Sequence, residues 1–334
     1  MKRSAACRLL LGVSLAAPVA GCGDAGERAP SVPRTSNIAA VIKGLDNPFF
    51  RTMRDGLLAT ARRYHARVHV EAAAGQSDAA GQASRLESQV PRRNTCYVVN
   101  PINQANLIQP LSRVAAGTPI VNIDSPVAQR QAAAVGVKIT SYVGTDNVAA
   151  GRAGATAMAA LLPPGSRVAV VTGPPGDATS GARINGFRAG AEGHFQVVES
   201  VAADFDRRKA MLAAEDLLRA DPHIDGFFAA NDLMALGIAK IAKRTVKVIG
   251  VDGIEEALTA VKRGAMSGTV AQYPYTIGQL GVEACLAAAR GKRIPARIDA
   301  PIQVVTKDNV DRAKANFPKP IEPFANPLTK LLER

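Results

Sequence analysis

The chain has 334 residues, of which 47% are hydrophobic and 21% are charged, and it carries a formal net charge of +13. This composition excludes a disordered or fibrous chain and leaves room for two globular domains that each bury a core. The positive charge does not predict a nucleic-acid partner, because the basic clusters have no interleaved aromatic side chains on which bases could stack. We expect Arg62-Arg63, Arg92-Arg93 and Arg207–Lys209 to be solvated helix faces and loop ends.

The chain starts with the pattern of an export signal. Three basic residues precede the apolar stretch Leu9–Val19, which is too short to span a bilayer but suits the core of a signal peptide. The stretch runs into Val-Ala-Gly-Cys22, which resembles the lipobox of bacterial lipoproteins, where the cysteine is lipidated and becomes the new N-terminus. We therefore predict a signal peptide over 1–21, lipidation at Cys22 and a flexible tether over 22–36. An ordinary signal peptide cut nearby at a small residue is the alternative.

Five short apolar runs then recur along the chain, and each ends abruptly in a polar side chain that leads into a helical pattern. Such runs are typical of buried parallel strands, and ligands of open α/β sheets bind outside the carboxyl ends of the strands. Three runs lie in the first half of the chain and two in the second, which predicts a cleft shared by two lobes. The polar residues that end the runs are Lys43, Asn100, Asp124, Asn231 and Asp252.

The remaining pattern is a long alternation of strands and helices, which implies right-handed βαβ units and a parallel sheet in each half. A further strand is predicted over 67–71. Helices are predicted over 78–90, 104–116, 146–161, 179–192, 206–220, 231–243, 254–263 and 276–290. The Pro-rich end over 317–327 reads as an extended tail. Cys96 falls in a strand pattern and Cys285 in a helix pattern, so we expect buried small apolar residues rather than a disulfide.

Five longer strings resemble, in order and spacing, the ribose/allose-binding group of periplasmic sugar-binding proteins, and the likeness covers roughly residues 37 to 308. The strings are Leu45–Phe50, Ala203–Arg207, Ala230–Gly237, Val248–Gly253 and Val270–Pro274. The resemblance implies an α/β fold of two doubly wound parallel-sheet lobes, joined by a three-segment hinge that crosses near Thr145, Gln272 and Pro301.

The same resemblance sets the domain boundaries. The N-terminal lobe would comprise 37–145 plus 273–301, and the C-terminal lobe 146–272 plus 302–308. Residues 309–334 would form a C-terminal tail.

The apolar part of the predicted site comes from two of these strings. Asn47 stands before Pro48, the arrangement of a helix N-cap with proline at the first helical position. By resemblance, Phe49 and Phe50 form a wall against the C–H face of a sugar ring, and Phe205 covers the opposite face from the other lobe. A core position is the alternative for each phenylalanine.

The polar part consists of the residues that end the strands. Asn100, Asp124, Asn231 and Asp252 could each cap the next helix, but together they suit sugar hydroxyls, which both donate and accept hydrogen bonds. Gln272 is an amide of the same kind. Arg183 matches, by resemblance, the arginine that forks onto sugar oxygens and balances the buried acids; an exposed helix position is its alternative.

Two positions depart from the ribose-binding pattern. Lys43 stands where that pattern has a serine, and Ser125 where it has an arginine. A lysine at the first position looks like the allose-binding branch and related polyol or hexose receptors. The resemblance thus implies a monosaccharide or polyol ligand and leaves ribose open.

No catalytic set is recognisable, so we expect no enzyme, no cofactor and no metal site. His65 and His69 have four-residue spacing but straddle a predicted helix-to-strand turn and would not share a helical face. We predict an exported, envelope-located, monomeric receptor that delivers its ligand to an ABC permease, with a chemoreceptor as a further candidate partner and a lipid anchor in the membrane. A LacI-like ligand-sensing regulator and an α/β sugar-processing enzyme are the alternatives.

Overall fold

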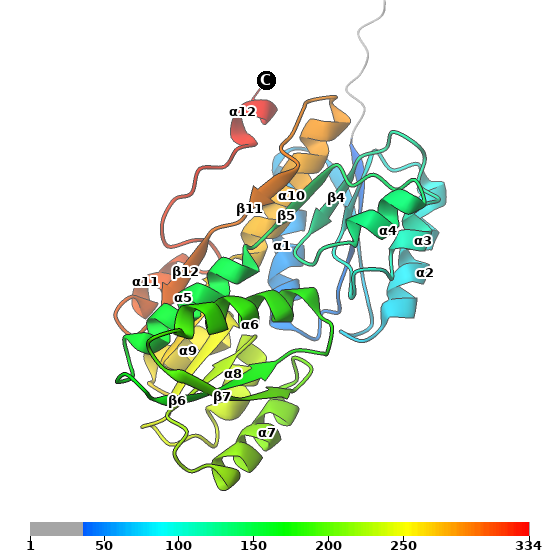
Figure 1. Cartoon of the computed structure of the whole chain (residues 1–334). Coiled ribbons are helices and arrows are strands. Elements are labelled where there is room, and N and C mark those ends of the chain that lie inside the picture. The colour runs from blue at the N-terminus through cyan, green and yellow to red at the C-terminus, as the bar shows by residue number, and fades with distance from the viewer. Residues whose placement is uncertain (1–35, 334) are drawn as a thin grey trace, which may run out of the picture. The chain divides into compact units, whose positions relative to one another are not determined.

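The computed structural model describes residues 36–333, and these form two lobes, each built on a six-stranded sheet (Figure 1). The first sheet is parallel throughout, in the order β11-β5-β4-β3-β1-β2. Its strands are β1 Asn37–Ile42, β2 Arg67–Ala72, β3 Cys96–Val99, β4 Ile120–Ile123, β5 Ser141–Gly144 and β11 Arg297–Asp299. The described residues belong to one compact unit.

The second sheet has the order β12-β10-β9-β8-β6-β7. Its strands are β6 Arg167–Thr172, β7 Gln196–Ala202, β8 Gly226–Ala229, β9 Lys247–Asp252, β10 Gly268–Gln272 and β12 Ile302–Val305. All neighbours pair in parallel except β12, which runs antiparallel to β10. The predicted fold class is confirmed, and the one antiparallel edge strand is the departure from an all-parallel sheet.

Helices cover the faces of each sheet. The first lobe has α1 Pro48–Arg63, α2 Ala79–Gln89, the 3-10 turn η1 Val90–Arg92, α3 Ile108–Leu111, α4 Gln129–Ala134 and α10 Pro274–Ala289. The second lobe has α5 Asn147–Ala159, α6 Ala178–Ala191, α7 Arg207–Ala220, α8 Asp232–Ile238, α9 Glu255–Lys262 and α11 Val310–Asn316. The last helix, α12 Thr329–Leu332, packs on α10. None of the helices within residues 36–333 has the length and apolarity needed to cross a membrane.

The five apolar runs are strands β1, β3, β4, β8 and β9, as predicted. All four residues of β3, β4 and β8 are buried, because helices lie on both faces of these central strands. The chain passes from one sheet to the other between β5 and α5, between β10 and α10, and between β11 and β12. Each lobe is therefore made of segments distant in sequence.

Several local predictions differ from the structure, among them the tail predicted over 309–334, which contains helices α11 and α12. The helix expected over 104–116 is limited to α3. The Asn103 side chain accepts hydrogen bonds from the amides of Ala105 and Asn106, and this forms a turn where the first helical turn was predicted. The helix expected over 231–243 ends at Ile238. Helix α4 was not anticipated, since Ala132 is its one buried residue and it carries no apolar stripe.

The C-terminal segment is extended over much of 317–328, but it is not a free tail. Ile321, Leu328 and Leu332 are buried, and the Asn326 side chain donates to Glu283 Oε2 on α10 at 2.7 Å. The segment therefore completes the packing around α10. The predicted signal peptide, Cys22 and most of the tether lie outside the described residues.

The prediction of two unlinked cysteines is wrong. Cys96 on β3 and Cys285 on α10 form a disulfide with a Cα–Cα distance of 5.7 Å across 189 residues of sequence. Both residues are fully buried in the first lobe. The strand and helix patterns were right, but they do not reveal that the returning helix α10 packs directly across β3.

Candidate binding site

A cleft of about 930 Å³ is lined by segments of both lobes, notably 102–105 and 125–128 from the first and 174–179 and 204–206 from the second. A smaller inner chamber of about 40 Å³ adjoins it. The two are neighbours because they share the lining residues Lys43, Gln76, Thr179 and Phe205. The inner chamber lies where the carboxyl ends of β1, β4, β8 and β9 are found, as expected for an open α/β sheet.

Nine of the twelve predicted site residues line the inner chamber. They are Lys43, Asn47, Phe49, Phe50, Asp124, Arg183, Phe205, Asn231 and Asp252. Ser125 lines the outer cleft instead. Asn100 and Gln272 are buried but line neither hollow. Residues more than 200 positions apart in sequence are thus brought together around one small space.

The apolar wall is set by the start of α1. Asn47 caps this helix, since its Oδ1 accepts from the amide of Phe49 at 2.9 Å, and its Nδ2 donates to Gln76 at 3.4 Å. The rings of Phe49 and Phe50 pack edge to face at 5.3 Å. Lys43 Nζ lies 5.6 Å from the centroid of the Phe50 ring, so the cation sits over an aromatic face.

Phe205 faces this wall from the second lobe. Asp204 and Phe205 have φ of 54° and 60°. Both lie in the left-handed backbone conformation, which non-glycine residues rarely adopt. The Phe205 ring lies against Gly173, where an added Cβ would come within 2.4 Å of the ring. A strained turn and a glycine therefore hold an aromatic ring at the mouth of the chamber, where it lines both hollows.

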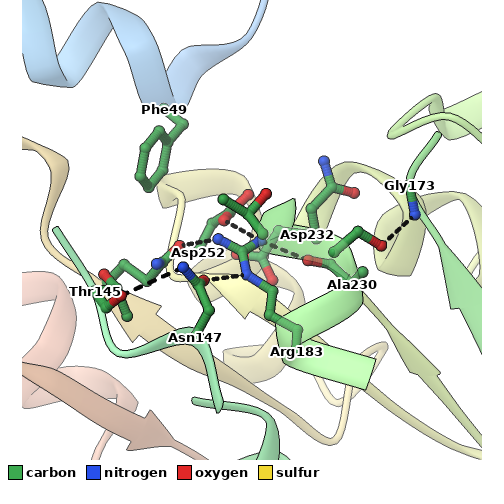
Figure 2. Close-up of polar contacts among 12 residues, drawn as sticks. Phe49, Thr145, Asn147, Gly173, Arg183, Ala230, Asp232 and Asp252 are labelled. Atoms are coloured by element: carbon green, nitrogen blue, oxygen red, sulfur yellow. Dashed lines mark hydrogen bonds and ion pairs between the residues drawn. The ribbon is translucent and has the colours of Figure 1, made fainter. Parts of the chain in front are cut away.

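Arg183 on α6 is buried and is fixed by four partners (Figure 2). Its Nε donates to Asn147 Oδ1 at 2.8 Å and its Nη1 to the carbonyl of Ala230 at 2.6 Å. Nη1 also lies 3.4 Å from Asp252 Oδ1, and Nη2 donates to Gln272 Oε1 at 2.7 Å. These four partners orient the guanidinium before any ligand arrives. Because a guanidinium has five N–H groups, it also retains donor capacity for a ligand.

Asp252 ends β9 with φ of 134°, and burial raises the pKa of its carboxyl well above the usual range, although the Arg183 guanidinium opposes the shift. The loop that follows Asp252 is held in place by the Asp232 side chain. The Asp232 carboxylate accepts from the amides of Gly253 and Ile254 at 2.7 and 3.0 Å and from Thr269 Oγ1 at 2.7 Å. Burial raises the pKa of Asp232 to about 6 despite these donors.

Asp124 ends β4 in the first lobe with φ of 60°. Its backbone carbonyl accepts from the Tyr142 hydroxyl at 2.6 Å, and Ser125 Oγ lies 3.4 Å from its carboxylate. Burial raises the pKa of the Asp124 carboxyl, while the positive charges of Lys43 and Arg183 act in the opposite direction. The chamber is therefore lined by two carboxyl groups, Asp124 and Asp252, and two basic side chains, Lys43 and Arg183.

Some buried polar atoms of the described residues have no hydrogen-bond partner, and three of them are close to the site. They are Asn100 Oδ1, an acceptor, Gln272 Nε2, a donor, and Thr145 Oγ1 at the first passage between the sheets. Such atoms are costly to leave unpaired. Their presence beside the chamber marks places where a polar ligand or water would be stabilised.

The sequence did not single out three residues that support the site. Asn147 is the first residue of α5, directly after the N-cap Asp146, and its side chain accepts a hydrogen bond from Arg183. Asp232 follows Asn231 directly, and only the folded structure shows its bonds to the next loop. Gln76 lies in a loop with no pattern of its own.

A model of the periplasmic binding protein domain matches residues 38–293. The ribose import binding protein of Bacillus subtilis is 34% identical over 81% of this chain and 87% of its own length. The D-allose-binding periplasmic protein of Escherichia coli is 33% identical over 77% and 86%.

A solved solute-binding protein of Actinobacillus succinogenes with bound D-allose is 29% identical, with a TM-score of 0.79 over 83% of this chain and 99% of that one. The range matched by the family model includes segments of both lobes. The chain belongs to the periplasmic binding protein family.

Proposed function

We propose that this protein is the solute-binding component of a sugar ABC import system, and that it holds one monosaccharide or polyol in the inner chamber. The relatives named for ribose and allose support this proposal, as does the solved neighbour with bound D-allose. The family consists of binding proteins, which favours this role over a regulator or an enzyme.

The observation that carries the proposal is the pre-oriented Arg183 beside Asp252, opposed across the chamber by Asp124 and Lys43. A sugar hydroxyl donates one hydrogen bond and accepts others, so it can bridge a carboxylate on one side and a cation on the other. Phe49, Phe50 and Phe205 supply apolar surface for the C–H faces of the ring. Binding in this way requires no bond to be broken.

The chamber of about 40 Å³ offers room for little more than a water or two, while the adjoining cleft is open to both lobes. The lobes must therefore separate to admit a sugar and close to contact it from both sides. A ligand that makes half of its contacts with each lobe favours the closed arrangement through those contacts. Closure would then present the loaded protein to the permease.

Ligand choice would depend on Lys43. A lysine cation on a flexible stem matches a different hydroxyl pattern from a rigid guanidinium fork. Ser125, which lines the outer cleft, stands where the ribose-binding pattern has an arginine and provides no guanidinium. This pair favours a hexose or polyol over ribose.

The proposal also includes attachment to the membrane through a lipid on Cys22, a monomeric state and, as a further use of the closed form, contact with a chemoreceptor. A Cys22→Ala variant expressed in its host should leave the membrane fraction. Retention of that variant in the membrane fraction after a high-salt wash, which removes proteins held by surface charge alone, would contradict the lipid anchor without affecting the sugar proposal.

Calorimetric titration with pentoses, hexoses, inositols and polyols tests the main proposal. We expect saturable binding of at least one member, with no turnover of the bound sugar. Arg183→Ala should lose at least ~2 kcal/mol of binding free energy, because the substitution leaves Asp252 and the ligand unpaired in a buried site.

Arg188→Ala is the matched control, since Arg188 is an exposed arginine on the same helix and lines neither hollow. No binding across the sugar panel, together with tight binding of an amino acid or nucleotide, would refute the proposal. Unchanged affinity in a folded Arg183→Ala variant would show that the site is misplaced.

A further inference from the structure

The amino ends of the first sheet's strands meet at one end of the first lobe, away from the binding cleft. Backbone bonds join the turns there: the amides of Arg67 and Thr95 donate to the carbonyls of Ser36 and Asn37 at 2.8 Å, and that of Tyr142 to Ala296 at 2.9 Å. We call this surface the basic end and define it by five segments, residues 62–66, 90–95, 112–119, 135–140 and 290–296.

The charge of the basic end has one sign. Its five segments contain nine Lys or Arg residues and no Asp or Glu, and all nine basic side chains are exposed. Arg113 pairs with Glu87 on α2. Of the ion pairs between described residues, none involves the other eight. Helix α12, which packs on α10, adds Lys330, and Glu333 follows the helix directly.

Helix dipoles explain only part of this pattern. Arg62 and Arg63 lie in the last turn of α1, where cations are favourable. However, Arg92, Arg93 and Lys138 belong to a 3-10 turn and to loops. The corresponding turns of the second lobe carry both signs.

The second lobe provides the comparison. Its turns over 160–166, 192–195, 220–225, 239–246 and 263–267 contain four basic and three acidic residues. One of these acids, Asp221, is paired with Arg167 at 2.6 Å. The same architecture therefore does not require an acid-free end, and the basic end calls for a separate explanation.

The described chain enters the fold at the basic end, because Ser36 is bonded to Arg67 there. The segment before it carries the lipobox-like Cys22. A short tether from a lipid to this point would bring the basic end, and not the binding cleft, toward the bilayer. Cations near an anionic bilayer add attraction in proportion to their number and lose it with salt.

We propose that the basic end is a docking surface for the headgroups of an anionic phospholipid bilayer. It would orient the first lobe on the membrane and leave the cleft open to ligand. This inference goes beyond sugar binding, and it does not depend on lipidation of Cys22, since the attraction is between the surface charges and the headgroups.

Residues 35–334 are suited to a test without the anchor. They form one compact unit. The solved relative with D-allose matches 83% of this chain over 99% of its own length, so a protein of that extent folds without the remaining residues. The probe is a set of vesicles of phosphatidylcholine alone or with about one third phosphatidylglycerol, at low and at physiological salt. We expect binding to the anionic vesicles, little binding to the neutral ones and a decrease with salt.

The main variant is R62E/R63E/R92E/R93E, which should lower partitioning onto anionic vesicles at least ~100-fold. The control is K240E/K243E/R244E/R263E, which changes net charge equally at exposed positions of the second lobe and should stay within about threefold of wild type. Should the main variant fold poorly by circular dichroism, K138E/K292E/R293E removes loop cations of the same surface and should also weaken binding.

Equal losses in the main variant and the control would overturn the proposal in favour of a net-charge effect. Equal binding of neutral and anionic vesicles would overturn it as well. Binding of heparin or a DNA fragment without binding of anionic vesicles would assign the surface to a soluble polyanion.

Discussion

The disulfide between Cys96 and Cys285 should account for a large share of the stability of the first lobe. It joins β3 to α10 and closes a loop across 189 residues of sequence. In the chain-entropy model, a cross-link over a loop of this length restricts the unfolded state by about 5 kcal/mol at 25 °C. We therefore expect a Cys96→Ala/Cys285→Ala variant to lose ~3–5 kcal/mol of free energy of unfolding.

The assay is denaturant unfolding followed by circular dichroism. The variant should also unfold with a steeper dependence on denaturant, because its unfolded chain is less compact and exposes more surface. Wild type unfolded in the presence of a strong reductant provides the same comparison without a change of side chain. Sugar affinity should be unchanged, since neither cysteine lines the chamber.

The sulfur atoms are buried, so dithiothreitol should act on the native protein only as fast as the first lobe opens. A loss of less than ~1 kcal/mol in both the double variant and the reduced wild type would refute the assignment of this stability to the cross-link. A loss in the double variant alone would instead indicate a packing defect left by the two missing sulfur atoms.

Three further predictions concern the site. Burial raises the folded-state pKa of Asp232 to about 6, above the value expected in the unfolded chain, so the unfolded state releases its proton first. The free energy of unfolding of the ligand-free protein should thus fall by up to ~3 kcal/mol between pH 4 and 6, and a rise over this interval in pH-dependent melting would contradict the reasoning. Exchanging Lys43→Ser together with Ser125→Arg should move sugar preference toward ribose in calorimetry, and an unchanged ranking would count against control of specificity by this pair. Phe205→Ala should cost ~1–2 kcal/mol of sugar binding with little loss of melting temperature, because the half-buried ring covers the ligand more than the core; equal affinity would exclude it as a wall.

Sequence patterns predicted the elements whose signal is local. The buried runs of β3, β4 and β8 read as parallel strands because both faces of each are apolar. Asn47 followed by proline identified the start of α1 within a residue. Polar residues at strand ends predicted that Asp124, Asn231 and Asp252 would lie around one space, since parallel strands bring their carboxyl ends to one edge.

The contacts that sequence could not provide are those made across the fold. Gln272 was predicted as a ligand contact, yet its Oε1 accepts from Arg183, and that role depends on the long Arg183 side chain of α6 reaching the end of β10. The pairing of Cys96 with Cys285 depends in the same way on the return of α10 to the first lobe. Local periodicity carries no information about contacts between segments that are distant in sequence.

The three passages of the chain between the sheets have a consequence for synthesis. Helix α10 packs on α1, β3 and β4, although it is made about 150 to 210 residues after they are. A nascent chain that ends before Pro274 would therefore leave one side of the first sheet and the inner face of α1 uncovered. The second lobe likewise lacks its edge strand β12, which pairs with β10, until β11 and β12 have both been synthesised. Neither lobe can be completed until nearly the whole polypeptide has emerged, which favours a late completion of folding and a chain that can still be threaded through a narrow channel.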